Sequence, residues 1–316
     1  MTLTAPLPTD VEAAAPPPAG EAAEVRRGGW SVRITILVIV ALWLIPTVGV
    51  LVTSFRPESV VNETGWWTVF AHLFDSGQWT LQNYRDALDT GGFENAFLNS
   101  LAVTVPATVI PITIAAFAAY AFSWMEFRGR YLMFVGVVAL LVVPLQMALI
   151  PILQLYSDGA QIGGVPIFPD LDLNGTFLGI WLAHTAFGLP LAVYLLRNFI
   201  GSLPSSIIES ARVDGADHFT IFWRLVVPLS VPALAAFAIF QFLWVWNDLL
   251  VARIFLGATE ENRVLTIALQ TLSGSRGQDW HLLTSAAFIT MILPLLVFFS
   301  LQRYFIRGLT AGAVKG

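Results

Sequence analysis

The sequence has no cysteine, one lysine and few charged residues, and each scarcity excludes a class of protein. Without cysteine there are no disulfide bonds and no thiolate metal sites. Charged residues make up 12% of the chain, about half of the roughly 25% typical of soluble domains. The lysine, Lys315, is followed only by Gly316, so a phosphate-binding G-x-x-x-x-G-K-[ST] loop is absent. The four histidines show no metal-like spacing, and we expect no catalytic residue, metal or cofactor in this chain.

Hydrophobic residues are abundant instead. They account for 56% of the 316 residues, and they are grouped in segments long enough for the roughly 20 residues that cross a bilayer. We therefore predict an all-α integral membrane protein with six transmembrane helices. The expected spans are 34–54, 95–125, 131–157, 173–197, 225–250 and 280–302. Most contain proline, which membrane helices tolerate when neighbouring groups satisfy the freed carbonyls.

The N-terminal segment differs from the rest. Residues 1–29 are rich in alanine, proline and glutamate, so we expect a disordered cytoplasmic tail, followed by one six-helix membrane domain over 30–316. Arg26 and Arg27 precede the first apolar run. Since that run is about 19 residues long, enough to span, we interpret the pair as a positive flank rather than as an export signal.

The basic residues are distributed unevenly between the two sides of the predicted membrane. With the N-terminus inside, eleven of the sixteen fall on the cytoplasmic side, as the tendency of positive loops to stay in the cytoplasm requires. Both termini are therefore expected in the cytoplasm.

A charged interlude, Pro204–Pro228, separates the fourth and fifth apolar runs. Pro204 suits the first turn of a helix, and Gly215 is expected to end that helix because glycine adopts positive φ without a steric penalty. Asp214 is expected to cap a second helix that starts at about Ala216. This helix-glycine-helix loop, over 200–228, is predicted to be cytoplasmic.

The second helix of the loop has an amphipathic pattern. Its apolar stripe, at the spacing i, i+3, i+4 and i+7, comprises Phe219, Phe222, Trp223 and Val226. A helix lying on lipid prefers basic residues along its polar face. In this loop the acids (Glu209, Asp214, Asp217) outnumber the arginines (Arg212, Arg224), so a protein partner is favoured over a lipid surface.

The spacing within the loop carries a resemblance to a known family. Glu209-Ser210-Ala211 is followed after three residues by Gly215, and after nine more by Leu225-Val226-Val227-Pro228. This resembles the EAA loop of ABC importer permease subunits, whose pattern is Glu-Ala-Ala, three residues, Gly, nine residues and Ile-x-Leu-Pro. Ser210 departs from the usual alanine, which leaves open how closely the first helix can approach a partner.

The resemblance covers about Arg33 to Gly316, and it is strongest to the sugar permeases of binding-protein-dependent systems. The segments that carry it, besides the loop, are Trp79–Leu88, Phe97–Leu101, Trp246-Asn247-Asp248 and the maltose-permease-like tail Gly308–Gly316. It implies a permease subunit in a bacterial or archaeal plasma membrane, importing a carbohydrate, with an oligosaccharide or glucoside favoured. The implied partners are a second permease subunit, two copies of a cytoplasmic ATPase that binds ATP and Mg²⁺, and an extracytoplasmic solute-binding protein.

Residue roles follow from the same resemblance. It implies that the loop residues Glu209, Ser210, Ala211, Asp214, Gly215, Ala216 and Pro228 couple the membrane helices to the ATPase. Glu209 would pair with a basic group, Ala211 would allow close approach, Gly215 would set the angle between the helices, and Pro228 would mark the turn into the fifth span.

A second set of residues is a candidate for the solute pathway or for contact with the binding protein. It comprises Asn247, Asp248, Gly274, Ser275, Arg276, Gly277 and Gln278. Glycine-serine stretches are also ordinary connectors, and small polar groups often only link helices, so a structural role stays open. Other intramembrane polar candidates are Asn99, Gln146, His184 and Gln241. His184 has no acidic neighbour in the sequence, which favours a helix–helix hydrogen bond over a proton relay.

Two alternatives remain at this stage. A secondary transporter driven by an ion gradient would show internal repeats and coupling-ion sites, and the sequence shows neither. An ABC importer permease for a non-sugar solute would have the same loop.

Overall fold

The computed structural model describes residues 29–89, 92–162, 164–272 and 279–313. These residues divide into two compact units at Val48 and Gly49. The elements in chain order are α1 (Trp30–Ser54), α2 (Glu58–Glu63), η1 (Trp66–Ala71), η2 (Ser76–Gln78), α3 (Gln82–Asp89), α4 (Phe93–Trp124), α5 (Arg130–Ala139), η3 (Leu140–Val142), α6 (Leu145–Asp158), β1 (Ala160–Ile162), β2 (Val165–Phe168), α7 (Phe177–Ile200), α8 (Ser205–Val213), α9 (His218–Ile221), η4 (Phe222–Val226), α10 (Val227–Trp246), α11 (Leu250–Phe255), α12 (Leu265–Leu272) and α13 (Trp280–Ala313).

The helical membrane fold is confirmed. Five helices in the described part of the chain are long and apolar enough to cross a bilayer, and counting the bent pair α5 and α6 as one span makes six. The five are α1, α4, α7, the continuous helix His218–Trp246 and the stretch Trp280–Arg303 of α13.

The third expected span, 131–157, is not one helix. Helix α5 with η3 meets α6 at an angle of 106°. Val143, which precedes Pro144, is extended at ψ 116°, because the proline ring excludes its preceding residue from helical geometry. Prolines inside α4, α7, α10 and α13 leave those helices continuous. At Pro144 the helix breaks, so the expectation that the helix tolerates its prolines is wrong there.

A short hairpin departs from the all-α prediction. Strands β1 and β2 pair antiparallel, with Ile162 opposite Val165. The sequence between the strands is Gly163-Gly164, and Gly164 has a φ of +83°. A glycine pair is a known hairpin signal. The sequence interpretation did not use it.

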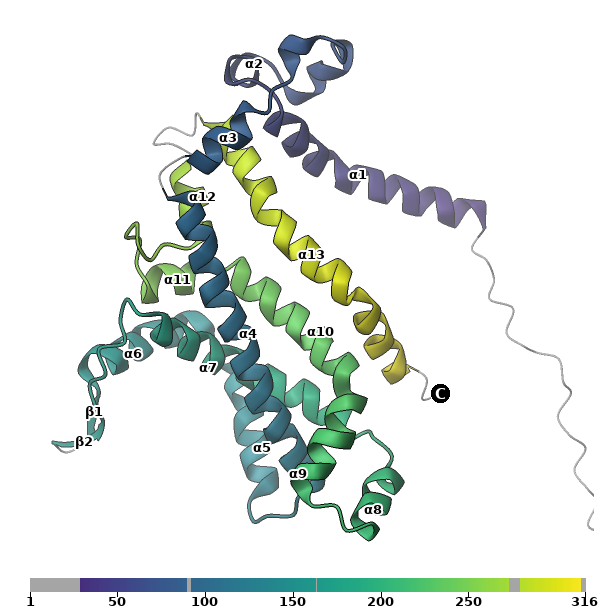
Figure 1. The fold of residues 1–316 in the computed structure, drawn as a ribbon, viewed down its shortest axis with the longest axis vertical. Coiled ribbons are helices and arrows are strands. Elements are labelled where there is room, and N and C mark those ends of the chain that lie inside the picture. Colours follow the sequence, from purple (N-terminus) through teal and green to yellow (C-terminus); the bar gives the residue numbers. More distant parts are fainter. Residues whose placement is uncertain (1–28, 90–91, 163, 273–278, 314–316) are drawn as a thin grey trace, which may run out of the picture. The chain divides into compact units, whose positions relative to one another are not determined.

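Within residues 49–316, α4 lies along α7 and α10, and α10 also lies along α13 (Figure 1). Their apolar faces meet in three clusters. One cluster joins α4 and α7 to α8 and to the turn after α9, a second joins the middle of α4 and α7 to α6 and α11, and the third joins α10 and α13 to α3 and α12. The charged loop is therefore built onto one end of a continuous helical core.

Candidate functional site

The loop between α7 and α10 contains a well-formed helix stop at Gly215. Its N–H donates to the carbonyl of Arg212 at 3.0 Å, and the N–H of Ala216 donates to the carbonyl of Ala211 at 2.9 Å. These are the two hydrogen bonds of the Schellman motif. Gly215 has a φ of +82°, and a Cβ there would meet no atom within 4 Å. Backbone conformation, rather than lack of space, therefore favours glycine at this position.

The second helix is capped by Asp217. Its carboxylate accepts a hydrogen bond from the N–H of Thr220 at 2.9 Å, and hydrogen bonds from Thr220 lower the pKa of Asp217. The prediction that Asp214 caps this helix is wrong, because Asp214 is the C-cap of α8 and the Schellman turn occupies the residues up to Ala216. Helix α9 consequently starts at His218 rather than at Ala216.

No turn separates this second helix from the membrane span. Helix α9 continues through a π-turn, η4, into α10, and Pro228 lies in the first turn of α10. The expected turn at Pro228 is therefore absent. The widened turn precedes the proline, whose ring would otherwise collide with the carbonyl of Arg224.

The apolar stripe of the second helix divides between two environments. Phe222 and Val226 are buried, and the ring of Phe222 stacks on Phe117 of α4 with centroids 4.5 Å apart. Phe219 and Trp223 are 66% and 47% exposed. One half of the stripe thus fixes the loop to the membrane helices, and the other half faces outward.

Three further contacts hold the loop against the end of α4. Arg212 donates to the carbonyl of Trp124 at 2.8 Å, and the hydroxyl of Tyr120 lies 2.9 Å from Nδ1 of His218. Ile208 is 1% exposed in the cluster below them. The contacting residues are 88 and 98 positions apart in the sequence, and no local pattern links them. A force applied to the loop therefore reaches α4 directly.

The outward side of the loop carries exposed acids, among them Glu209, together with exposed apolar side chains. Glu209 is exposed, and among the described residues its carboxylate has no ion pair or hydrogen bond. Val213, at the end of α8, is 87% exposed. Ala211, expected to face a partner, is half-buried against the permease-side cluster, whereas Ser210 beside it is exposed. An exposed acid on the same helix as an exposed valine suits a protein partner.

At the other end of α10, Asp248 lies two residues before the short helix α11. Its carboxylate accepts hydrogen bonds from the N–H groups of Val251 at 3.3 Å and Ala252 at 2.8 Å. The same carboxylate lies 3.8 Å from Nε2 of His184, which is fully buried in α7. His184 therefore does have an acidic neighbour, contrary to the sequence interpretation, and the two are 64 positions apart.

These features fall within one family of transport proteins. Residues 111–311 match the family described as binding-protein-dependent transport system inner membrane component. The chain belongs to this family. It is 59% identical to the osmoprotective compounds uptake permease protein GgtD of Synechocystis sp., with 90% of this chain and 91% of that protein covered. It is 44% identical to the alpha-glucoside transport system permease protein AglG of Rhizobium meliloti (strain 1021), with 91% and 97% covered.

A solved structure agrees with the fold of this permease. A chain of a bacterial ABC transporter involved in the import of the acidic polysaccharide alginate superposes with a TM-score of 0.69 at 21% identity, covering 87% of this chain and 95% of that one. The resemblance inferred from the Glu209-to-Pro228 spacing is thereby confirmed at the level of the family. The protein is a membrane-embedded permease component of an ABC importer and works with a solute-binding protein.

Two residues of the Trp246-Asn247-Asp248 group have structural roles in this permease. Trp246 is 3% exposed, and its Nε1 donates to the carbonyl of Thr290 in α13 at 3.2 Å. Asn247 donates to the carbonyl of Leu243, one turn earlier in its own helix, at 2.8 Å. The tryptophan therefore ties α10 to α13 instead of anchoring the chain at the membrane surface.

The other intramembrane candidates are mostly linkers between elements. Nε2 of Gln241, which is fully buried, donates to the carbonyl of Ala107 in α4 at 3.1 Å. A Cβ at Gly188 would lie 2.7 Å from the Gln241 amide, so glycine there lets α7 approach it. Asn99 donates to the carbonyl of Glu261 at 2.7 Å. Gln146 is exposed.

A cavity of about 280 Å³ lies beside the break between α5 and α6 and is lined mainly by apolar side chains, including Leu145, Ile152 and Phe187. It offers few hydrogen-bonding partners to a sugar. The remaining candidates, Gly274, Ser275, Arg276, Gly277 and Gln278, lie outside the described residues, so their proposed contact with a binding protein stays a prediction.

Proposed function

We propose that this permease forms half of the membrane pathway for a carbohydrate of the glucoside class, delivered by an extracytoplasmic solute-binding protein. One relative supports this solute class, since it is an alpha-glucoside transport system permease protein and is covered over 97% of its length. A second candidate solute is an osmoprotective compound, the class in the name of the relative that is 59% identical, and the members of that class that are not sugars distinguish it from the first.

A solute panel separates these two candidates. In proteoliposomes containing the complete importer, the binding protein loaded with an α-glucoside is expected to raise ATP hydrolysis at least about fivefold over the unloaded binding protein, as coupling of 1–3 kcal/mol allows. Non-sugar osmolytes should leave hydrolysis near the unloaded rate. If those osmolytes stimulate ATP hydrolysis and are taken up while glucosides are not, the carbohydrate assignment is wrong and the second candidate is supported.

The geometry of the loop supports a proposed mechanism that couples ATP hydrolysis to the membrane helices. The partners we propose are a second permease subunit and two copies of a cytoplasmic ATPase, which binds the ATP and Mg²⁺. The exposed carboxylate of Glu209, one helical turn before the exposed Val213, is the observation that carries this proposal. Glu209 and Ser210 face the ATPase, Gly215 and Ala216 set the second helix through the Schellman turn, and Asp214 and Pro228 lie at the ends of their helices.

The proposed orientation places this loop and both termini in the cytoplasm of a cell bounded by a plasma membrane. Because the chain has no cysteine, a single introduced thiol reports its own side without background. In intact cells an impermeant maleimide should label Glu63→Cys and should not label Arg128→Cys until the membrane is opened. Both positions are exposed. Labelling of Arg128→Cys in intact cells would show that the proposed orientation is wrong.

A further inference from the structure

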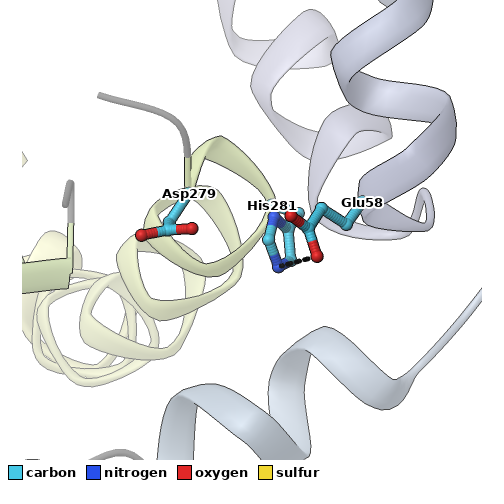
Figure 2. Close-up of side chains that lie close together, drawn as sticks. All are labelled: Glu58, Asp279 and His281. Carbon is cyan, nitrogen blue, oxygen red and sulfur yellow. Dashed lines mark ion pairs between the residues drawn. The ribbon is translucent and has the colours of Figure 1, made fainter. Parts of the chain in front are cut away.

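Three potential metal ligands converge where α2 meets the start of α13. Glu58 is the first residue of α2, Asp279 directly precedes α13, and His281 lies in its first turn (Figure 2). One ligand atom from each residue lies within 4.8 Å of the other two. Glu58 is more than 200 positions from Asp279 and His281 in the sequence, so the fold brings it to the other two.

The imidazole of His281 lacks the partners that a buried histidine needs. The residue is 7% exposed, and Nδ1 is buried with no hydrogen-bond partner among the described residues. Nε2 faces the Glu58 carboxylate at 3.9 Å, which is beyond hydrogen-bonding distance. Leaving a buried polar group unsatisfied costs about 1–3 kcal/mol. Nε2 is therefore directed toward the Glu58 carboxylate without a hydrogen bond to it, and Nδ1 has no partner among the described residues.

The backbone around the cluster is held by a buried hydrogen-bond network. The side chain of Asn83, 3% exposed, donates to the carbonyls of Ser54 at 2.9 Å and Arg56 at 2.8 Å. The hydroxyl of Ser285 in α13 donates to the carbonyl of Asn83 at 3.1 Å. Asn83 thus fixes the segment that leads into Glu58 against the helix that carries His281.

We propose that Glu58, Asp279 and His281 bind a divalent transition-metal ion of the zinc class, with water completing the coordination. Tetrahedral zinc with bonds of about 2.0–2.1 Å brings its ligand atoms to roughly 3.3 Å from one another. The longest separation between ligand atoms must therefore shorten by up to about 1.5 Å from 4.8 Å. The side chain of Glu58 is 60% exposed and Asp279 is half-buried, so rotation of the two carboxylate side chains supplies that movement without displacing a helix.

The ligand types select the class of metal. Imidazole suits zinc and neighbouring transition metals, whereas Ca²⁺ and Mg²⁺ prefer sites built entirely from oxygen. Because the two carboxylates and the histidine come from α2 and from the α13 region, a bound ion joins these elements at the end of the membrane domain opposite α8. Such a link fixes the segment after α1 to the last membrane helix.

The test uses the untagged full-length permease in detergent, stripped with a chelator and then titrated with Zn²⁺, with bound metal measured after equilibrium dialysis. We expect one Zn²⁺ per chain, and a loss of affinity of at least about tenfold in Glu58→Gln and in Asp279→Asn, since even supporting residues of metal sites contribute 10–100-fold. Both changed side chains are solvent-accessible, so neither variant is expected to unfold. Glu63→Gln, an exposed acid on the same helix, is the matched control and should bind as the wild type does.

Three outcomes would overturn the proposal. The first is Zn²⁺ binding in the Glu58→Gln/Asp279→Asn double variant that equals the wild type, which would place any bound ion elsewhere. The second is that added Ca²⁺ displaces the bound ion as readily as added Zn²⁺ does, which would contradict the role of the histidine. The third is absence of stoichiometric binding in the wild type.

Discussion

Reversing the charge of Glu209 is expected to abolish the ATP hydrolysis that the solute-binding protein stimulates in the reconstituted importer. Glu209 is exposed on α8, and its carboxylate is unpaired within the described chain. A like-charge contact in a protein interface costs several kcal/mol, and each 1.4 kcal/mol is a tenfold change. Glu209→Arg should therefore lower stimulated hydrolysis at least about tenfold, measured as phosphate release in proteoliposomes.

The same substitution should leave the membrane domain folded. The contacts that hold the loop to α4 involve Ile208, Arg212 and His218 rather than Glu209, so the variant should elute from a sizing column as the wild type does. Glu126→Arg, at an exposed acid between α4 and α5, is the matched control and should keep most of the stimulation. If Glu209→Arg shows near-normal hydrolysis with the normal amount of ATPase bound, Glu209 is not part of the coupling contact.

The long apolar helices were largely predictable from the sequence because a bilayer requires about 20 apolar residues to be crossed. Each expected span overlaps one long apolar helix, except at 131–157. There the sequence contains Pro144 and Pro151, and only the first breaks the helix, since Pro151 lies inside α6. Whether a helix stays continuous at a proline depends on which neighbouring groups bond the carbonyl that the proline leaves without a donor. Those neighbours are set by the tertiary structure.

The loop shows the same division between local and long-range information. Gly215 could be placed from the sequence because a helix stop depends on nearby residues. The hydrogen bond from Arg212 to Trp124 and the contact between Tyr120 and His218 could not, since the partners lie on another helix. The choice between Asp214 and Asp217 as the cap depended on how many residues the Schellman turn uses. Either aspartate is a good cap by type.

Arg56 has a structural role that counting charges on each side of the membrane did not reveal. In the predicted orientation it is one of the five basic residues on the extracytoplasmic side. In the structure it is 1% exposed. Its guanidinium donates to the carbonyl of Gly65 at 2.9 Å, to the hydroxyls of Thr64 at 2.6 Å and Thr68 at 3.2 Å, and to Oε1 of Gln78 at 3.2 Å. One buried cation thus organises the segment between α1 and α3.

Arg56→Met is therefore expected to unfold this segment locally while the membrane helices stay intact. Methionine retains the apolar stem and loses every donor, and a hydrogen bond to a charged group contributes about 1.5–3 kcal/mol. A loss of about 3 kcal/mol corresponds to roughly 100-fold faster amide hydrogen exchange over residues 57–80. The matched control, Arg85→Met, removes an exposed arginine from α3 and should leave those rates unchanged. Equal exchange in the two variants would mean that the segment is held by its apolar contacts, such as the buried Val69, and that the buried guanidinium does not determine its fold.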